Sequence, residues 1–418
     1  MKIDYLYIEN FRGIQNLEIS NFSNLNVITG INGAGKSSIL HVIKILLSWL
    51  IARIRNAKGN GIAITDKDIT MGKNYCLLKI GMDNGLTWQL YKQRANVRTK
   101  AEYKTELSKM TAYANRIAEE LGKDASSNIL LIDSYGVNRI VSETPMRVRA
   151  AHKLNPIDAL SIEMSNSVNF HEFFIWFREM EDIENEQLRN TGVLSKDRRL
   201  EAVRKTIPSM FDGYADFRVQ RSPKKAFVIT KGNAKLDFNQ LSDGEKSYMA
   251  LVFDMARKMA MTHPNLDNPL AGDGIVLIDE IDLHLHPSWQ RDVIGKLQRI
   301  FPHCQFFITT HSPHVVSCVN IAAGDKLIVI DNGEVAESCG NNYGRESGII
   351  LADIFQLDSL RNPIVQSHID KVWSCLRKKD YESEAFTEEL SWLKKNVDPA
   401  DSIFVQINLQ IALIKKGS

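Results

Sequence analysis

The segment that most constrains the fold is a glycine-rich loop at residues 30–37. It reads Gly30-Ile31-Asn32-Gly33-Ala34-Gly35-Lys36-Ser37 and fits the pattern GxxxxGK[ST]. A strand pattern at residues 25–29 precedes it, and apolar residues with helical spacing follow it from Ile39. In a strand–loop–helix setting, the backbone N–H groups of such a loop surround phosphates, and the helix N-terminus adds a favourable dipole. The sequence therefore predicts an α/β fold with a P-loop.

Residue types in and beyond the loop suit a nucleotide with its metal ion. Lys36 should reach the β- and γ-phosphates, and the Ser37 hydroxyl should coordinate Mg²⁺. A continuous apolar strand at residues 274–278, typical of a buried parallel strand, ends at Asp279, which should hold the same ion. A glycine turn without a ligand is the alternative, but the full-length match and the second strand disfavour it. ATP and Mg²⁺ are the expected cofactors.

Two further residues are candidates for catalysis. Glu280 follows Asp279 directly, and a carboxylate there can polarise the water that attacks the γ-phosphate. His311 lies just past the next buried strand, residues 305–309, where its imidazole could donate a hydrogen bond to the γ-phosphate. A histidine after a strand is more often structural. The setting Thr310-His311-Ser312 reverses that preference.

Composition excludes several classes of protein. The 418 residues carry 52 Lys+Arg against 50 Asp+Glu, a formal charge of +2, which argues against a surface committed to coating nucleic acid. The five cysteines lack the spacing of a zinc site, so reduced thiols are expected.

No secretory signal is visible, and the longest apolar run, residues 38–51, is interrupted by His41 and Lys44 and is too short to cross a bilayer comfortably. We predict a cytoplasmic protein without a membrane span.

Periodicity predicts alternating strands and helices, with a less regular middle. A helical face carries Phe170, Phe173, Phe174 and Phe177. We expect it to pack on the fold, with a partner-docking or DNA-sensing arm as the alternative. The other expected helices cover residues 99–121 and 247–261 and most of the chain after 340, and the other strands cover residues 3–8, 15–19, 76–80, 86–91, 128–133, 216–220, 226–230 and 326–330.

Two other groups of polar residues invite functional interpretations. Asp282, His284 and His286 could hold a metal ion, but a loop that contacts a second subunit is the more economical explanation. A basic face for nucleic acid could come from four arginines, although solvated surface is the more common outcome: Arg94, Arg98, Arg147 and Arg149.

Taken together, the motifs resemble those of ABC-type ATPases of the RecF, SMC and OLD branch. Ile8-Glu9-Asn10-Phe11-Arg12-Gly13 is similar to the N-terminal signature of that branch, and Leu241-Ser242-Asp243-Gly244-Glu245-Lys246 to its ABC signature. Asp279-Glu280-Ile281-Asp282-Leu283-His284-Leu285-His286-Pro287 resembles the Walker B and D-loop run, and Thr310-His311-Ser312-Pro313 the H-loop. The motifs anchor residues 1–95 and 220–335, about half of the chain.

The resemblance implies a fold and a site. The fold is an ABC-type P-loop head, a mixed sheet with flanking helices, which carries a largely helical insertion and a helical C-terminal tail. Hydrolysis would be slow, in a head-to-tail dimer where Ser242 and Gly244 of one subunit cap the ATP bound by the other. The residues expected around the nucleotide are Arg12, Asn32, Gly33, Ala34, Gly35, Lys36, Ser37 and Ser38, with Ser37 and Asp279 on the metal and Glu280 and His311 in catalysis.

The expected domains follow from the motif positions. Residues 1–128 form the first part of the ATPase lobe, 129–221 a mainly helical insertion, 222–340 the second part of the lobe, and 341–418 a helical region for partner binding or oligomerisation. The Q-loop glutamine has no clear counterpart, and the segment Ser134-Tyr135-Gly136-Val137-Asn138-Arg139 offers Asn138 instead. The signature has Asp243 and Glu245 where transporters have Gly and Gln, so its phosphate contacts are left open. Sustained heptads and an Asp-x-Asp nuclease cluster are absent, so neither a long coiled coil nor intrinsic DNA cleavage is expected.

The residues after about 340 resemble one group of proteins within that branch. Tyr343-Gly344-Arg345-Glu346-Ser347-Gly348 and the helical pattern around residues 381–395 look like the stand-alone ATPases of Septu-type anti-phage systems, including those attached to retrons. That family implies a homodimer or larger homo-oligomer that works with a separate HNH nuclease, and contact with DNA directly or through that partner. A RecF-like repair ATPase that binds DNA is the alternative, and an ATP-dependent scaffold without nucleic acid is a third.

Overall fold

The computed structural model describes residues 1–95, 97, 103–139, 155–161, 170–193, 196–222, 226–336 and 340–416. These residues form two compact units, Met1–Ile350 and Leu351–Ser418. The first unit contains the three sheets and the motifs, and the second is helical.

A six-stranded sheet forms the centre of the first unit. Its order is β13-β12-β3-β11-β10-β6, and all neighbouring strands are parallel except β12 and β13. Apolar runs such as Gly274–Ile278 are fully buried, as parallel strands covered on both faces require. The strands span β13 Glu334–Val335, β12 Lys326–Asp331, β3 Leu25–Thr29, β11 Cys304–Thr309, β10 Gly274–Ile278 and β6 Leu131–Tyr135.

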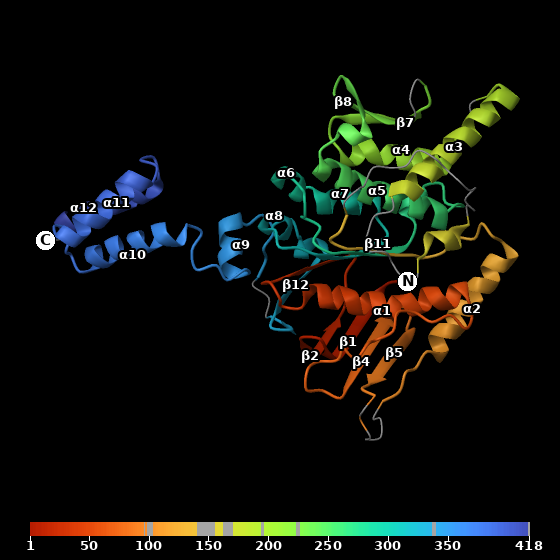
Figure 1. Ribbon diagram of the computed structural model, residues 1–418, viewed down its shortest axis with the longest axis horizontal. Coiled ribbons are helices and arrows are strands. Elements are labelled where there is room, and N and C mark those ends of the chain that lie inside the picture. Colours follow the sequence, from red (N-terminus) through yellow and green to blue (C-terminus); the bar gives the residue numbers. More distant parts are fainter. Residues whose placement is uncertain are drawn as a thin grey trace. The chain divides into compact units, whose positions relative to one another are not determined.

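A four-stranded antiparallel sheet lies on the other side of helix α1 (Lys36–Arg55), which is thereby enclosed between the two sheets (Figure 1). Fourteen of the helix residues are buried, so the apolar run after the glycine loop forms part of the core. The four strands, in spatial order, are β2 Ile14–Ser20, β1 Ile3–Phe11, β4 Tyr75–Met82 and β5 Thr87–Gln93.

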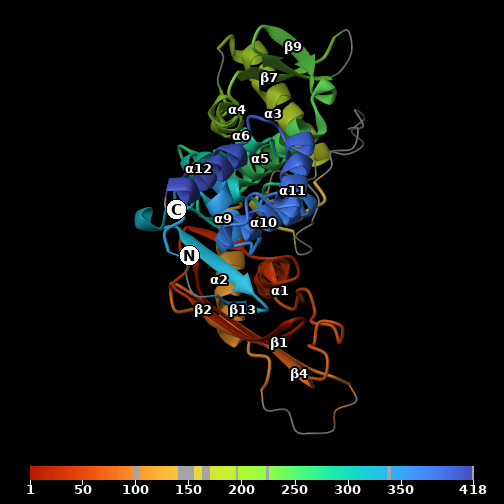
Figure 2. The same cartoon turned by 90° about the vertical axis from the view of Figure 1, so that its left-hand side faces the viewer.

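A third sheet, β7-β8-β9, lies beside helices α3 and α4, at the end of the unit opposite β1 and β4 (Figure 2). Phe170, Phe173, Phe174 and Phe177 are all buried on α3, as the packing interpretation predicts. These elements are β7 Tyr214–Gln220, β8 Ala226–Lys231, β9 Ala234–Asp237, α3 Phe170–Thr191 and α4 Arg198–Met210.

Helix α5 (Asp243–Thr262) is joined to β6 by buried charges. Lys258 Nζ lies 2.6 Å from Asp133 Oδ2 on β6 and 2.8 Å from Asp254 Oδ2 on α5. The Tyr135 hydroxyl donates to Asp254 at 3.1 Å, and Arg257 lies 2.8 Å from the same carboxylate. Burial alone would raise the pKa of Asp254, but Lys258 and Arg257 hold it below its usual range. The network therefore keeps these buried groups charged and paired.

The remaining helices are α2 and several short helices of the first unit, together with the helices from Ser347 onwards. In Leu351–Ser418, Ile369, Val372, Phe386, Leu393 and Ile407 are among the residues of a separate core. The bounds are α2 Ser108–Lys123, α6 Pro287–Gln290, α7 Val293–Ile300, α8 Pro313–Val316, α9 Ser347–Asp353, α10 Pro363–Arg377, α11 Glu384–Asn396 and α12 Ser402–Lys416, with 3-10 turns at Pro156–Ala159, Phe238–Gln240, Pro269–Ala271 and Ile321–Ala323.

Three elements differ from the sequence expectations. The helix expected from residue 99 begins at Ser108, because Glu106 exchanges backbone hydrogen bonds with Gln89 of β5 at 3.0 and 3.1 Å. The helix expected from residue 247 begins at Asp243, where Ser242 caps it. β6, which falls inside the range 129–221, is an edge strand of the six-stranded sheet.

Helix α1 is longer than the apolar run suggested. Its 20 residues are long and apolar enough to cross a membrane, but 72% of its apolar window is buried inside the protein. Burial, rather than length, makes it a core helix.

Candidate functional site

The glycine loop turns sharply between β3 and α1. Gly30, Gly33 and Gly35 have φ angles of 142°, 80° and 112°, which side chains rarely adopt. A Cβ at Gly30 would lie 2.1 Å from the carbonyl oxygen of Ile330, so this position also has no room for a side chain. Among the described residues, none caps the N-terminus of α1 with its side chain. The N–H groups of its first turn are therefore available to an anion.

The side chain of Lys36 curls back over this loop. Its ammonium donates to the carbonyl oxygens of Gly30 at 3.0 Å and Ile31 at 2.7 Å, and the residue is only 6% exposed. Burial lowers the pKa of Lys36, whereas the carboxylates of Glu280 and Asp279 oppose this shift. The cation is thus held at the point where the loop and the Walker B carboxylates meet.

Hydroxyl and carboxylate oxygens converge at the ends of β10 and β11. Ser37 Oγ donates to Asp279 Oδ1 at 3.0 Å, and Thr309 Oγ1 donates to the same oxygen at 2.5 Å. Ser37 and Asp279 therefore come together as the sequence predicts. Thr309 is a site residue that the sequence analysis missed, although it is the last residue of a buried strand beside the Walker B strand.

Glu280 has a constrained backbone. Its φ is 48°, in the left-handed region that costs energy for a residue with a side chain. Its N–H donates to Thr309 Oγ1 at 2.7 Å, and its carbonyl accepts from Arg139. Arg139 is 3% exposed and lies just after β6. The last residue of β6, Tyr135, accepts a hydrogen bond through its carbonyl from the N–H of Asp279 at 2.8 Å. The segment that the sequence offered for the Q-loop therefore lies beside Walker B, and it contributes Arg139.

His311 lies at the same edge of the sheet. The N–H of His311 and the hydroxyl of Thr310 both donate to Asp282 Oδ1, at 3.4 and 2.5 Å. Burial lowers the pKa of His311, and the Lys36 ammonium lowers it further. The imidazole is therefore neutral at neutral pH, with one ring nitrogen able to donate.

The signature segment forms the exposed start of α5. Ser242 and Glu245 form a capping box, in which Glu245 Oε2 accepts from the N–H of Ser242 at 2.8 Å. Partial burial alone would raise the pKa of Glu245, but Lys231 and Tyr214 lower it to about 2. A Cβ at Gly244 would lie 2.4 Å from the carbonyl oxygen of His284, so the signature packs against the loop after Walker B.

The other predicted residues have the following positions. Asn32 and Gly33 are exposed in the loop, Ala34 is buried, and Ser38 is half-buried on α1. Arg12 donates to Asp68 Oδ1 through Nε at 3.1 Å and Nη2 at 3.0 Å, beside rather than within the loop.

Of the two alternative sites, the metal site does not form among the described residues, and the basic face can be followed at only one of its four arginines. His286 caps α6 by accepting from the N–H of Ser288 at 3.3 Å, and no described group of three His, Cys, Asp or Glu side chains could hold a metal ion. Arg94 donates to the carbonyls of Lys73 and Ile69, so its guanidinium stabilises a loop. Three of the four arginines of the expected basic face lie outside the described residues: Arg98, Arg147 and Arg149.

A parallel sheet with a Walker A loop after β3, Walker B carboxylates after β10 and a histidine after the strand between them defines a P-loop ATPase of the ABC type. Residues 25–317 match the family described as "AAA domain, putative AbiEii toxin, Type IV TA system". The chain belongs to this family.

Relatives of the chain carry the names of retron ATPases and of the Septu protein PtuA. It is 27% identical to the "Retron Ec83 probable ATPase" of Escherichia coli, over 98% of this chain and 86% of the relative. It is 29% identical to the "Septu protein PtuA" of Bacillus mycoides (strain KBAB4), over 79% of this chain and 41% of that relative. An SMC head structure bound to the C-terminal winged-helix domain of ScpA aligns with a TM-score of 0.44 and 14% identity, over 82% of this chain and 96% of that chain.

Proposed function

We propose that this chain is the ATP-binding and ATP-hydrolysing switch subunit of an anti-phage defence complex, which dimerises head-to-tail around ATP and controls a separate HNH-type nuclease that cleaves DNA. The observation that carries the proposal is the convergence of Lys36, Ser37, Asp279 and Glu280 at the carboxyl ends of β3 and β10. The names of the retron and Septu relatives favour defence over a RecF-like role in repair.

The residues of the loop are suited to bind the triphosphate. No side chain of the described residues caps the first turn of α1, so the N–H groups of that turn are open to phosphate oxygens. Lys36 donates to neutral carbonyl oxygens of its own loop, whereas phosphate oxygens would offer this ammonium a negatively charged acceptor. ATP binding would therefore redirect this ammonium from Gly30 and Ile31.

The oxygen donors of the site fit a magnesium ion. Ser37 Oγ and Asp279 Oδ1 are hard oxygen atoms, the type of ligand that Mg²⁺ prefers. Thr309 Oγ1 donates to the same Asp279 oxygen. Ser37 and Asp279 would hold the ion. When bound, Mg²⁺ would neutralise charge on the phosphate oxygens.

Glu280 and His311 would act on the γ-phosphate. Glu280 would orient and polarise the attacking water, because its backbone is held on one side by Thr309 and on the other by Arg139. His311 would donate its ring N–H to a γ-phosphate oxygen, and its lowered pKa keeps that ring neutral. Ser242 and Gly244 of a second subunit would complete the site from the exposed start of α5.

The ATPase half of the proposal is tested by phosphate release from the purified chain. Glu280→Gln should abolish hydrolysis and preserve ATP binding, because it removes the carboxylate that polarises water and keeps the shape. Glu119→Gln, on the exposed face of α2, is the matched control and should hydrolyse like the wild type. Wild-type turnover in Glu280→Gln would refute the catalytic assignment.

The head-to-tail dimer is tested with two substitutions of the signature residue Ser242, one that adds a negative charge and one that does not. Asp and Asn both cap helices well, so Ser242→Asp and Ser242→Asn should both fold. Only Ser242→Asp would place a carboxylate against the γ-phosphate. Mass measurement with Mg-ATP should find dimers of the Glu280→Gln chain and of its Ser242→Asn derivative, but not of its Ser242→Asp derivative. Equal dimerisation of both derivatives would exclude head-to-tail closure.

The defence half is tested by co-expression with the gene that lies next to this one, which the proposal expects to encode an HNH nuclease. Purification through this chain should recover the nuclease, and Glu280→Gln should change its DNA cleavage. Failure to recover any complex would count against the partner assignment while leaving the ATPase result intact.

A further inference from the structure

The outward face of the four-stranded sheet carries lysine and tyrosine side chains that are not part of the proposed ATPase site. Its other face packs on α1 through residues such as Leu78 and Ile80. The strand register places Tyr7 opposite Lys79, and Lys79 opposite Gln89. Side chains that alternate with the core residues therefore form a row across this outward face.

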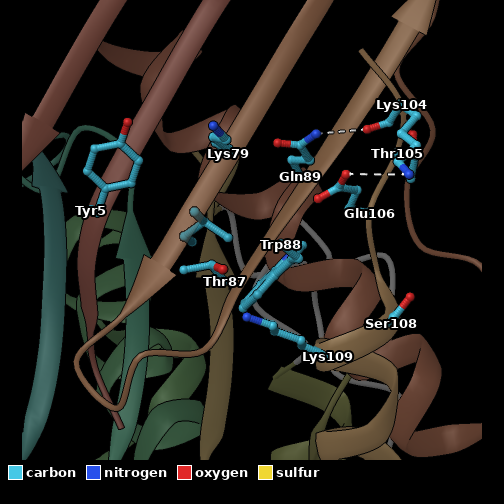
Figure 3. A pocket seen from close by; sticks show the side chains of 11 residues that line it. Tyr5, Lys79, Thr87, Trp88, Gln89, Lys104, Thr105, Glu106, Ser108 and Lys109 are labelled. Carbon is cyan, nitrogen blue, oxygen red and sulfur yellow. Dashed lines mark hydrogen bonds and ion pairs between the residues drawn. The ribbon is translucent and has the colours of Figure 1, made fainter.

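A cavity of about 610 Å³ opens on this face (Figure 3). Lys79 rises from the sheet between Tyr5 on one side and the segment with Lys104 on the other, and Lys109 lies below them. The lining has three lysines, Lys79, Lys104 and Lys109, and one carboxylate, Glu106. Lys79 and Lys109 form no ion pair with any residue in the described part of the chain, and Lys104 meets Glu106 only at 3.9 Å with both side chains exposed. The cavity is therefore cationic.

A buried glycine near the end of β4 lets Tyr5 pack closely on this surface. Gly81 faces Tyr5 on β1 and Thr87 on β5, and its φ is not in the left-handed region. A Cβ there would lie 3.3 Å from the Tyr5 Cβ and 3.5 Å from the Thr87 Cγ2. The glycine thus lets the Tyr5 side chain lie close against the strand, because a side chain at this position would crowd it.

Further along the same face lies a group of tyrosine rings. Tyr103 is 41% exposed, and its ring centroid is 6.0 Å from that of Tyr75 and 6.2 Å from that of Tyr91. The Tyr75 hydroxyl donates to Glu9 at 2.5 Å, which fixes that ring at its edge. From Gly81 to Tyr75 the strand rises about 20 Å. The face therefore carries a group of lysines beside Tyr5 and a group of aromatic rings further along the strand.

We propose that a single strand of nucleic acid binds along this face, with phosphates at Lys79, Lys104 and Lys109 and unpaired bases stacked on Tyr5 and Tyr103. Lysines that track a backbone and rings that stack bases are the two elements of sequence-tolerant single-strand binding. A duplex cannot use the rings, because its bases are already stacked. DNA and RNA share this chemistry. The proposal goes beyond the ATPase function and does not depend on it.

The first test measures affinity against salt with the full chain. Fluorescein-labelled oligonucleotides of one mixed sequence serve as probes, as single-stranded DNA, single-stranded RNA and duplex DNA. Each lost phosphate contact lowers the slope of log affinity against log salt by about 0.7, so the triple variant Lys79→Gln/Lys104→Gln/Lys109→Gln should lose about 2 from that slope. The matched control, Lys58→Gln/Lys67→Gln/Lys123→Gln, removes three exposed lysines elsewhere and should keep it.

The second test separates stacking from charge. Tyr5→Ala and Tyr103→Ala should each weaken single-strand binding about tenfold, whereas Tyr5→Phe and Tyr103→Phe keep the ring and should bind nearly as the wild type does. A thermal unfolding midpoint equal to that of the wild type establishes that each variant is folded. Four results would overturn the proposal: no binding of either single strand by the wild type, preferential binding of the duplex, an unchanged salt slope in the lining variant, or an equal loss in the control variant.

Discussion

The guanidinium of Arg139 donates a hydrogen bond to the backbone carbonyl of Glu280. The opposite side of the same residue is held by Thr309, whose hydroxyl accepts from the Glu280 N–H at 2.7 Å. A left-handed φ of 48° at Glu280 persists only if the surroundings enforce it. Arg139 is therefore a positioning residue for the proposed catalytic carboxylate.

Replacing Arg139 should misplace Glu280. We expect Arg139→Ala to lower kcat about 100-fold with little change in KM for ATP, because a displaced catalytic group costs rate rather than substrate binding. Arg139→Lys, which keeps a cation and a donor, should recover part of that rate. Phosphate release across ATP concentrations separates the two parameters. A loss confined to KM would show that Arg139 contacts the nucleotide instead.

Lys36 should matter for binding more than for folding. Lys36→Ala should weaken ATP binding about 10- to 100-fold, since a charge-assisted bond to phosphate contributes about 1.5–3 kcal/mol. Lys36→Met keeps the stem of the side chain and should lose as much affinity. Titration with a fluorescent ATP analogue measures both. Lys58→Ala, an exposed lysine beyond α1, should bind ATP normally. Wild-type affinity in Lys36→Met would exclude the phosphate contact.

Gly244 should resist even the smallest side chain. Gly244→Ala places a Cβ 2.4 Å from the carbonyl oxygen of His284, so the start of α5 must shift at a cost of about 1–3 kcal/mol. Gly295→Ala, in α7, meets no atom within 4 Å and should stabilise the protein by up to about 1 kcal/mol. Urea unfolding compares the two variants. Equal effects would mean that helix propensity, and not packing against His284, decides the result.

His41 should make stability depend on pH. Burial, with Arg12 nearby, lowers the pKa of His41 to about 4 in the folded chain. The unfolded chain takes up this proton first, near pH 6.5, so stability is present above that pH and is lost as the pH falls towards 4. At pH 5 the loss should be about 1–2 kcal/mol, allowing for the partly exposed ring. Urea unfolding at pH 7 and pH 5 should show a smaller loss for His41→Gln. The same loss in both proteins would exclude this histidine as its source.

The contiguous motifs of the site could be predicted because each one carries its own local structure. A glycine loop between a strand and a helix fixes where Lys36 and Ser37 lie, and a buried strand fixes where Asp279 lies. Their meeting, with Ser37 Oγ 3.0 Å from Asp279 Oδ1, follows because parallel strands present their carboxyl ends at one edge. Whether these residues bind ATP stays a prediction.

Arg139 and Thr309 were missed because their partners are backbone or neighbouring-strand atoms. The bond from Arg139 to Glu280 depends on β6 lying next to β10, and lateral strand order leaves no local pattern in a sequence. The late start of α2 has a similar cause. Residues before Ser108 have helical periodicity, but pairing of Glu106 with Gln89 on β5 prevails over it.

The buried charges between α5 and β6 join the helix firmly to the strand. Lys258, near the far end of the helix, is clamped to Asp133 at 2.6 Å and lies about 24 Å along the axis from Ser242. Separating such buried, paired charges costs several kcal/mol, so the helix and the strand stay joined at this point. The strand continues into the loop of Arg139 and so to Glu280. The exposed start of α5 is thus connected, through one set of buried ion pairs and one strand, to the loop that holds the backbone of Glu280.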